Sequence, residues 1–119
     1  MVVDDNQDAA ETLSLLLLNA GFSTRFACSG EAALRLIQFA MPDICLVDIG
    51  MPGMDGSEHV RRLRALPSAQ AVLCVATTGW GRDENRKDAL AAGFDHHITK
   101  PVDVDTLVTL LEQHFKVAL

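Results

Sequence analysis

Short apolar runs alternate with longer amphipathic stretches along the chain, and this alternation predicts strands that alternate with helices. Apolar runs between turn-forming residues fit strands that are covered on both faces, as in a parallel sheet. The predicted strands lie at residues 1–3, 22–27, 44–47, 71–76 and 94–99. The predicted helices lie at about residues 7–20, 31–40, 57–66, 82–92 and 104–116. Because acids follow the first run directly, we expect the first strand to be truncated at its N-terminus.

Capping residues and apolar spacing refine the predicted helices. Asn6 and Ser29 have side chains that cap a helix N-terminus, and Gly21 supplies the left-handed conformation that closes the first helix. Apolar spacing in the first helix predicts a buried stripe made of Leu13, Leu16, Leu17 and Ala20. The third helix has a basic side, which we interpret as a solvated face, made of Arg61, Arg62 and Arg64.

The alternation of five strands with five helices predicts an α/β fold. It calls for a doubly wound parallel sheet with helices on both faces and right-handed crossovers. The short connections favour the flavodoxin-like strand order 2-1-3-4-5. No internal repeat or linker-like segment interrupts the pattern, so we predict a single domain over residues 1–119.

Composition and charge exclude several classes of protein. The chain has 119 residues, 49% of them hydrophobic, and can bury a core without disulfide or metal staples. Its net charge of -6 argues against direct nucleic-acid binding, which needs clustered Lys and Arg. Cys28, Cys45 and Cys74 lack metal-binding spacing and indicate thiols in a reducing compartment. The apolar stretches are too short to span a bilayer, so we expect a cytoplasmic domain without membrane contact.

Polar residues stand where the predicted strands end. Asp4 and Asp5 follow the first strand, Asp48 the third, Thr78 the fourth and Lys100 the fifth. The carboxyl ends of parallel strands meet at one edge of the sheet, where α/β proteins bind ligands. Carboxylates held this close repel by about 4 kcal/mol per pair at an effective dielectric of about 20. One lysine cannot cancel that repulsion, whereas a divalent cation can.

Mg2+ suits this group of acids because it prefers one or two carboxylates, a carbonyl oxygen and retained waters. We expect Asp4, Asp5 and Asp48 to hold the ion together with the backbone carbonyl of Gly50. His, Cys and Met are absent from the group, which argues against zinc or copper.

A carboxylate beside a bound cation can act as a nucleophile toward phosphorus, because the positive charges offset those of the acid and of the phosphoryl group. Asp48 is the candidate acceptor. Thr78 would contact the phosphoryl oxygens as a hydroxyl donor, and Lys100 would contact them as a mobile positive charge.

Five separated motifs lie at residues 2–6 (VVDDN), 46–56 (LVDIGMPGMDG), 78–79 (TG), 91–95 (AAGFD) and 100–101 (KP). Together they resemble the motifs of the receiver domains of two-component response regulators. The resemblance implies that a histidine kinase or a histidine phosphotransfer protein donates a phosphoryl group to Asp48 with Mg2+. It implies a phosphoacceptor that assists its own phosphorylation and dephosphorylation rather than an enzyme. It also implies that the bond before Pro101 is cis.

The resemblance further implies a conformational switch. Thr78 would move toward the phosphoryl group and remodel the face formed by the predicted helix 82–92, strand 94–99 and helix 104–116. An attached output domain, a kinase domain or a dimer partner would read that face. The polar fourth helix and residues 100–103 (KPVD) resemble receivers attached to hybrid sensor kinases more than those that precede winged-helix domains.

Two residues depart from the family pattern. His97 stands where the family usually has the Tyr or Phe that swings inward on activation. We hypothesise that His97 acts as this ring and that its response depends on protonation, since histidine ordinarily titrates near pH 6.5; the alternative is a half-buried strand histidine. Trp80 lies beside a position that influences hydrolysis of the aspartyl-phosphate, which predicts slow self-dephosphorylation.

Three other readings fit parts of the same pattern. A haloacid-dehalogenase-type phosphohydrolase also uses an Asp nucleophile and Mg2+, but it needs a second acid at the position of Gly50. A flavodoxin-like electron carrier needs a phosphate-binding loop where Asp4 and Asp5 stand. A pseudo-receiver would keep the fold as an interaction module without phosphotransfer.

Overall fold

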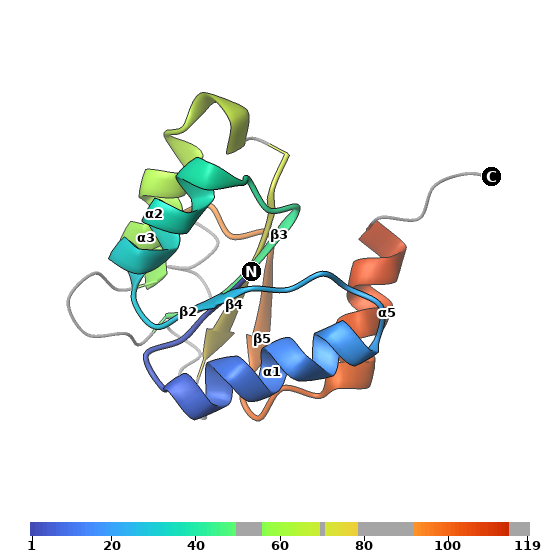
Figure 1. Cartoon of the computed structure of the whole chain (residues 1–119). Helices are drawn as coiled ribbons and strands as arrows, with labels where there is room; N and C mark the ends of the chain where they lie inside the picture. Colours follow the sequence, from blue (N-terminus) through green and yellow to red (C-terminus); the bar gives the residue numbers. More distant parts are fainter. Residues whose placement is uncertain (50–55, 70, 79–91, 115–119) are drawn as a thin grey trace.

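The computed structural model describes residues 1–49, 56–69, 71–78 and 92–114. The strands are β1 (Val2–Val3), β2 (Phe26–Ala27), β3 (Ile44–Asp48), β4 (Leu73–Thr78) and β5 (His96–Thr99). The helices are α1 (Gln7–Asn19), α2 (Gly30–Phe39), α3 (Gly56–Arg64) and α5 (Val104–His114), with a 3-10 helix at Pro67–Ala69 (Figure 1). Gly50, Trp80 and all but the last residue of the predicted helix 82–92 lie outside the described residues. Within the described part of the chain, no helix has the length and apolar character needed to cross a membrane.

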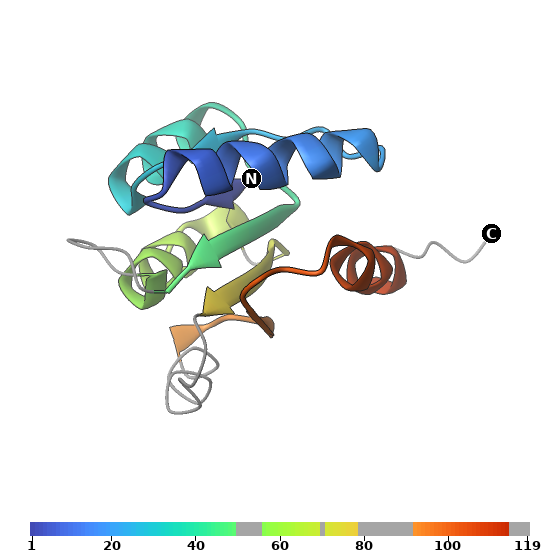
Figure 2. The same cartoon turned by 90° about the horizontal axis from the view of Figure 1, so that it is seen from below.

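The strands form one parallel sheet in the order β2-β1-β3-β4-β5, which confirms the predicted flavodoxin-like topology. The arrows of β3 (green) and β4 (yellow) point the same way in Figure 2. β3 lies in the middle, where Val47 pairs with Val3 of β1 and Asp48 pairs with Thr77 of β4. This register brings the residues after β1 and at the end of β3 to one edge of the sheet.

Two apolar cores cover the two faces of the sheet. The first core joins the sheet to α2 and α3, and its helical members are Ala33, Ile37, Val60 and Leu63. The second joins the sheet to α1 and α5, and its helical members are Ala10, Leu17, Leu107 and Leu111. Figure 1 shows these two helix pairs on opposite sides of the strands. Successive residues of β4 alternate between the cores, so Cys74 and Ala76 face α2 and α3, whereas Leu73 and Val75 face α1 and α5.

The predicted helix caps are confirmed. The Asn6 side chain accepts a hydrogen bond from the Ala9 amide, and the Ser29 side chain accepts one from the Ala32 amide, each at 3.1 Å. Gly21 has a φ of 103°, in the left-handed region that favours glycine at a helix end.

The predicted buried stripe of α1 is partly wrong. Leu17 is buried, but Leu16 is 42% exposed and Ala20 is exposed as well. The buried side instead includes Ser14, whose hydroxyl donates a hydrogen bond to Thr24 Oγ1 at 2.7 Å. The Thr24 hydroxyl in turn donates to the backbone carbonyl of Ser14 at 2.9 Å. These bonds also hold the chain between α1 and β2, and β2 is shorter than predicted.

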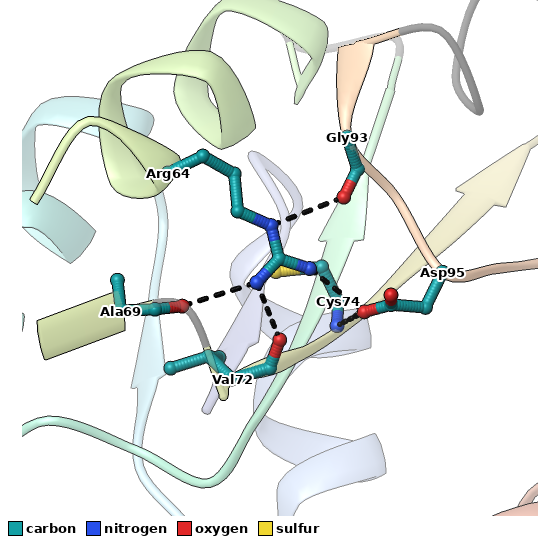
Figure 3. A network of polar contacts seen from close by, with 6 residues as sticks. All are labelled: Arg64, Ala69, Val72, Cys74, Gly93 and Asp95. Carbon is teal, nitrogen blue, oxygen red and sulfur yellow. Dashed lines mark hydrogen bonds and ion pairs between the residues drawn. The ribbon is translucent and has the colours of Figure 1, made fainter.

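Arg64 is not part of a solvated face, contrary to the sequence interpretation. Its guanidinium donates hydrogen bonds to three backbone carbonyls and pairs with a carboxylate, as Figure 3 shows. The partners are Gly93 O at 3.1 Å, Ala69 O at 3.1 Å, Val72 O at 2.7 Å and Asp95 Oδ2 at 2.7 Å. Asp95 Oδ2 also accepts from the Cys74 amide at 2.8 Å. Arg64 therefore fastens the end of α3 to the start of β4 and to the segment before β5.

Replacing Arg64 by Met should lower the free energy of unfolding by about 2–4 kcal/mol, because partly buried carbonyls lose a charged donor. Urea denaturation at neutral pH measures the loss. The matched control is Arg62→Met, since the exposed Arg62 pairs with Glu58 one turn away and should contribute less than about 0.5 kcal/mol. Equal losses in the two variants would contradict a special role for Arg64.

His59 is a buried polar residue that the sequence did not single out. It lies on α3 with 0% exposure, and neither ring nitrogen has a hydrogen-bond partner among the described residues. Burial lowers the pKa of the imidazole, and the nearby Gly30 backbone and Glu31 carboxylate offset only part of this effect. The folded chain therefore keeps this ring neutral at pH values where an exposed histidine takes up a proton.

His59 should make stability fall in mild acid. As the pH falls through about 6.5, the unfolded chain takes up a proton at His59 that the folded chain refuses, so stability decreases by at most about 1.4 kcal/mol per pH unit. In His59→Leu this part of the pH dependence should disappear. Urea denaturation at about pH 7.5 and about pH 5.5 tests this. The control His96→Leu removes a half-buried histidine of β5 and should keep this pH dependence. If the dependence disappeared in His96→Leu and remained in His59→Leu, its assignment to His59 would be refuted.

Candidate functional site

The sheet brings three carboxylates together at its edge. Asp4 follows β1 directly, Asp48 ends β3, and Asp5 is the next residue after Asp4. One oxygen from each lies within 4.8 Å of the others. Asp4 and Asp48 are buried, with 7% and 9% exposure, whereas Asp5 is exposed. We call Asp4, Asp5 and Asp48 the acid cluster.

Lys100 connects the acid cluster to the end of β5. Its Nζ lies 3.0 Å from Asp4 Oδ2 and 3.2 Å from Asp48 Oδ2. Burial alone would lower the pKa of the ammonium group, but the hydrogen bond with Asp4 and the charge of Asp48 outweigh it and raise the pKa. The Lys100–Pro101 peptide bond that follows is cis.

Asp5 titrates at a higher pH than an ordinary aspartate because of its place in the acid cluster. Its pKa is raised, first by desolvation, then by a hydrogen bond with Asp4 and by the charges of Asp48 and Asp4. The Oδ1 atom of Asp4 accepts a hydrogen bond from the backbone amide of Asn6 at 3.0 Å, and its Oδ2 atom accepts one from Lys100. Both oxygens of this carboxylate are therefore held. The cluster thus carries more negative charge than one lysine neutralises, and these hard oxygen ligands could hold a divalent metal ion.

Thr78 lies at the end of β4, but its hydroxyl is engaged elsewhere. Thr78 Oγ1 lies 2.7 Å from Nε2 of His97, on the neighbouring strand β5. The Lys100 amide donates to the Thr78 carbonyl at 2.6 Å. The two residues expected to act with Asp48 are therefore adjacent through their backbones, while the Thr78 side chain is bonded to His97.

A cleft of about 450 Å³ opens beside the acid cluster, between α1 and the start of α5. Its polar lining includes Asp4, Thr77 and Lys100, and its apolar lining includes Leu13, Leu16, Pro101 and Val102. Sequence reasoning missed Thr77 and placed Leu16 in the core. The sequence did contain a signal for Thr77. Side chains alternate along a strand, so Thr77 projects to the same side as Val75, which faces α1 and α5. Gly50, the expected carbonyl ligand, lies outside the described residues.

Comparison with known proteins gives consistent matches. The family model described as "Response regulator receiver domain" matches residues 1–112. A protein of Leptolyngbya boryana, named for its mass of 14.6 kDa and the sodA1 3' region, is 36% identical over 96% of this chain and 87% of its own length. The regulatory protein AtoC of Escherichia coli is 31% identical over 95% of this chain, which spans only 24% of AtoC.

A solved structure agrees in fold. The crystal structure of the chemotaxis protein CheY4 of Vibrio cholerae superposes with a TM-score of 0.89 and 27% identity, covering 96% of this chain and 95% of CheY4. The family model covers nearly the whole chain, and the described sheet has the topology of these relatives. The chain therefore belongs to the response regulator receiver domains, the signalling domains of two-component systems that interact with histidine kinases.

Proposed function

We propose that this domain is a phosphoacceptor switch in which Asp48 receives a phosphoryl group with the help of Mg2+. The observation that carries the proposal is the position of Lys100, whose ammonium group touches both Asp4 and Asp48 at the mouth of the cleft. A cation held between a metal-binding acid and the acceptor is placed to neutralise charge as a phosphoryl group arrives.

The acid cluster fits Mg2+ by the chemistry of its donors. The oxygens of Asp4, Asp5 and Asp48 lie within 4.8 Å of one another, and the described cluster contains neither nitrogen nor sulfur ligands. Asp5 is exposed, which suits an ion that keeps several waters. When bound, the ion would supply positive charge to the phosphoryl oxygens and lower the repulsion within the cluster.

The residues of this chain would then divide the remaining work. An Asp48 oxygen would form the new O–P bond while the N–P bond of a phosphohistidine breaks, and the freed imidazole would leave with the donor protein. Lys100 would move its ammonium group onto a phosphoryl oxygen. Thr78 would donate its hydroxyl proton to another oxygen.

The donor is best accommodated at the cleft between α1 and the start of α5. Its lining combines Asp4 and Lys100 with the apolar Leu13 and Leu16, and the two leucines would pack against a phosphohistidine-bearing protein. The change after phosphorylation would be read on the face that includes β5 and α5, by an attached output or kinase domain or by a second receiver. A cytoplasmic location is proposed because Cys28, Cys45 and Cys74 are all free thiols.

Incubation with acetyl phosphate and Mg2+ should add about 80 Da, the mass of one phosphoryl group, to the wild-type chain. Asp48→Asn should remove the gain, because an amide oxygen is too weak a nucleophile. Intact-mass spectrometry measures both. Asp43→Asn is the matched control, since Asp43 lies just before the opposite end of β3 and is exposed.

The same assay separates the competing functions. A pseudo-receiver gains no mass, and a phosphohydrolase turns over donor in excess of the protein without accumulating the gain of about 80 Da. Either result, or a full gain in Asp48→Asn, would refute the proposal.

Asp5→Asn should weaken Mg2+ binding at least about tenfold, the equivalent of about 1.4 kcal/mol, because it removes a carboxylate from the acid cluster. Isothermal titration calorimetry with MgCl2 measures the dissociation constant. Glu11→Gln removes an exposed acid from α1 outside the cluster and should leave it unchanged. Equal weakening in the two variants would indicate a general charge effect instead of a site.

A further inference from the structure

The hydrogen bond between Thr78 and His97 gives the switch hydroxyl a specific partner. Thr78 is 3% exposed, and its Oγ1 lies 2.7 Å from His97 Nε2. Ala76 and His97 are register partners, as are Thr78 and Thr99, so both side chains project from the same face of neighbouring strands. The contact therefore follows from the sheet register.

Which group donates in this bond depends on the tautomer of His97. A threonine hydroxyl has one proton to donate, and a buried hydroxyl proton needs an acceptor. Among the described residues, the contact made by Thr78 Oγ1 is with His97 Nε2. In the His97 tautomer that satisfies this buried hydroxyl, Nε2 is unprotonated and accepts the bond, and the ring proton sits on Nδ1.

We propose that His97 is a positioning residue that holds the Thr78 proton away from the acid cluster until Asp48 is phosphorylated. This inference rests on the proposed function, in which the same proton is donated to a phosphoryl oxygen. The two acceptors compete, because one proton cannot serve both. The phosphoryl oxygen wins because a charged acceptor makes the stronger bond.

A phenyl ring at position 97 would fill similar space but offer no acceptor. The bond that His97 contributes is a neutral one, and such bonds contribute modestly to stability. Removing it should therefore favour phosphorylation by a factor of roughly two to ten, because Thr78 no longer has to leave a partner.

The test compares rates of Asp48 phosphorylation with acetyl phosphate and Mg2+, followed by intact-mass spectrometry. His97→Phe should react roughly two to ten times faster than the wild type. In a Thr78→Val background, the same His97→Phe change should have no effect, because the contested proton is gone. The matched control is His96→Phe on the same strand, which should react like the wild type because His96 pairs with Val75 and projects from the other face.

A second measurement reads the bond directly. The 15N chemical shifts of the His97 ring should show an unprotonated Nε2 that accepts a hydrogen bond, and Thr78→Val should move that shift toward the value of a free acceptor. The His96 shifts should stay unchanged.

The outcomes separate the inference from the proposed function. Each of three results would overturn the inference alone. His97→Phe could be phosphorylated no faster than the wild type, or the same change could accelerate phosphorylation equally in the Thr78→Val background. The 15N shifts could also show that Nε2 of His97 carries a proton in the neutral ring. If the wild type takes up no phosphoryl group at all, the proposed function fails and the role of His97 in it fails too.

Discussion

The repulsion among Asp4, Asp5 and Asp48 is the interaction on which the rest of the site depends. Acids with oxygens within 4.8 Å of one another are unfavourable neighbours, and desolvation together with the charges of Asp48 and Asp4 raises the pKa of Asp5. The fold keeps them together because β1 and β3 are adjacent, and their positions are fixed by apolar pairs such as Val3 with Val47. Packing of the sheet thus holds in place an arrangement that electrostatics alone would push apart, and Lys100 offsets part of the excess charge.

Much of the fold could be predicted because its determinants are local. The strand order followed from short connections between apolar runs, and the caps at Asn6 and Ser29 depend on residues only three positions away. The acid cluster with Lys100 could also be located, because parallel strands place their carboxyl ends at one edge. These features need no knowledge of which side chains meet across the core.

What could not be predicted depends on contacts between distant residues. Arg64 looks like a surface residue in sequence, yet its partners Gly93 and Asp95 lie 29 and 31 positions later. Leu16 matches a helical stripe, but it is exposed and lines the cleft, whereas Ser14 is buried and bonded to Thr24. The role of His97 as a partner of Thr78 likewise needed the register of β4 and β5.

Strand alternation also sets how the proposed phosphorylation would reach the rest of the domain. Thr77 faces the cleft beside the acid cluster, whereas Thr78 follows Ala76 toward the opposite face, where His97 holds it. Lys100 touches both sides: its ammonium group binds Asp4 and Asp48, and its amide binds the Thr78 carbonyl at 2.6 Å. The residue that is proposed to meet the phosphoryl group is therefore also hydrogen-bonded to the strand that carries Thr78. In the proposed function, this one residue would link the charge at one face of the sheet with the hydroxyl at the other.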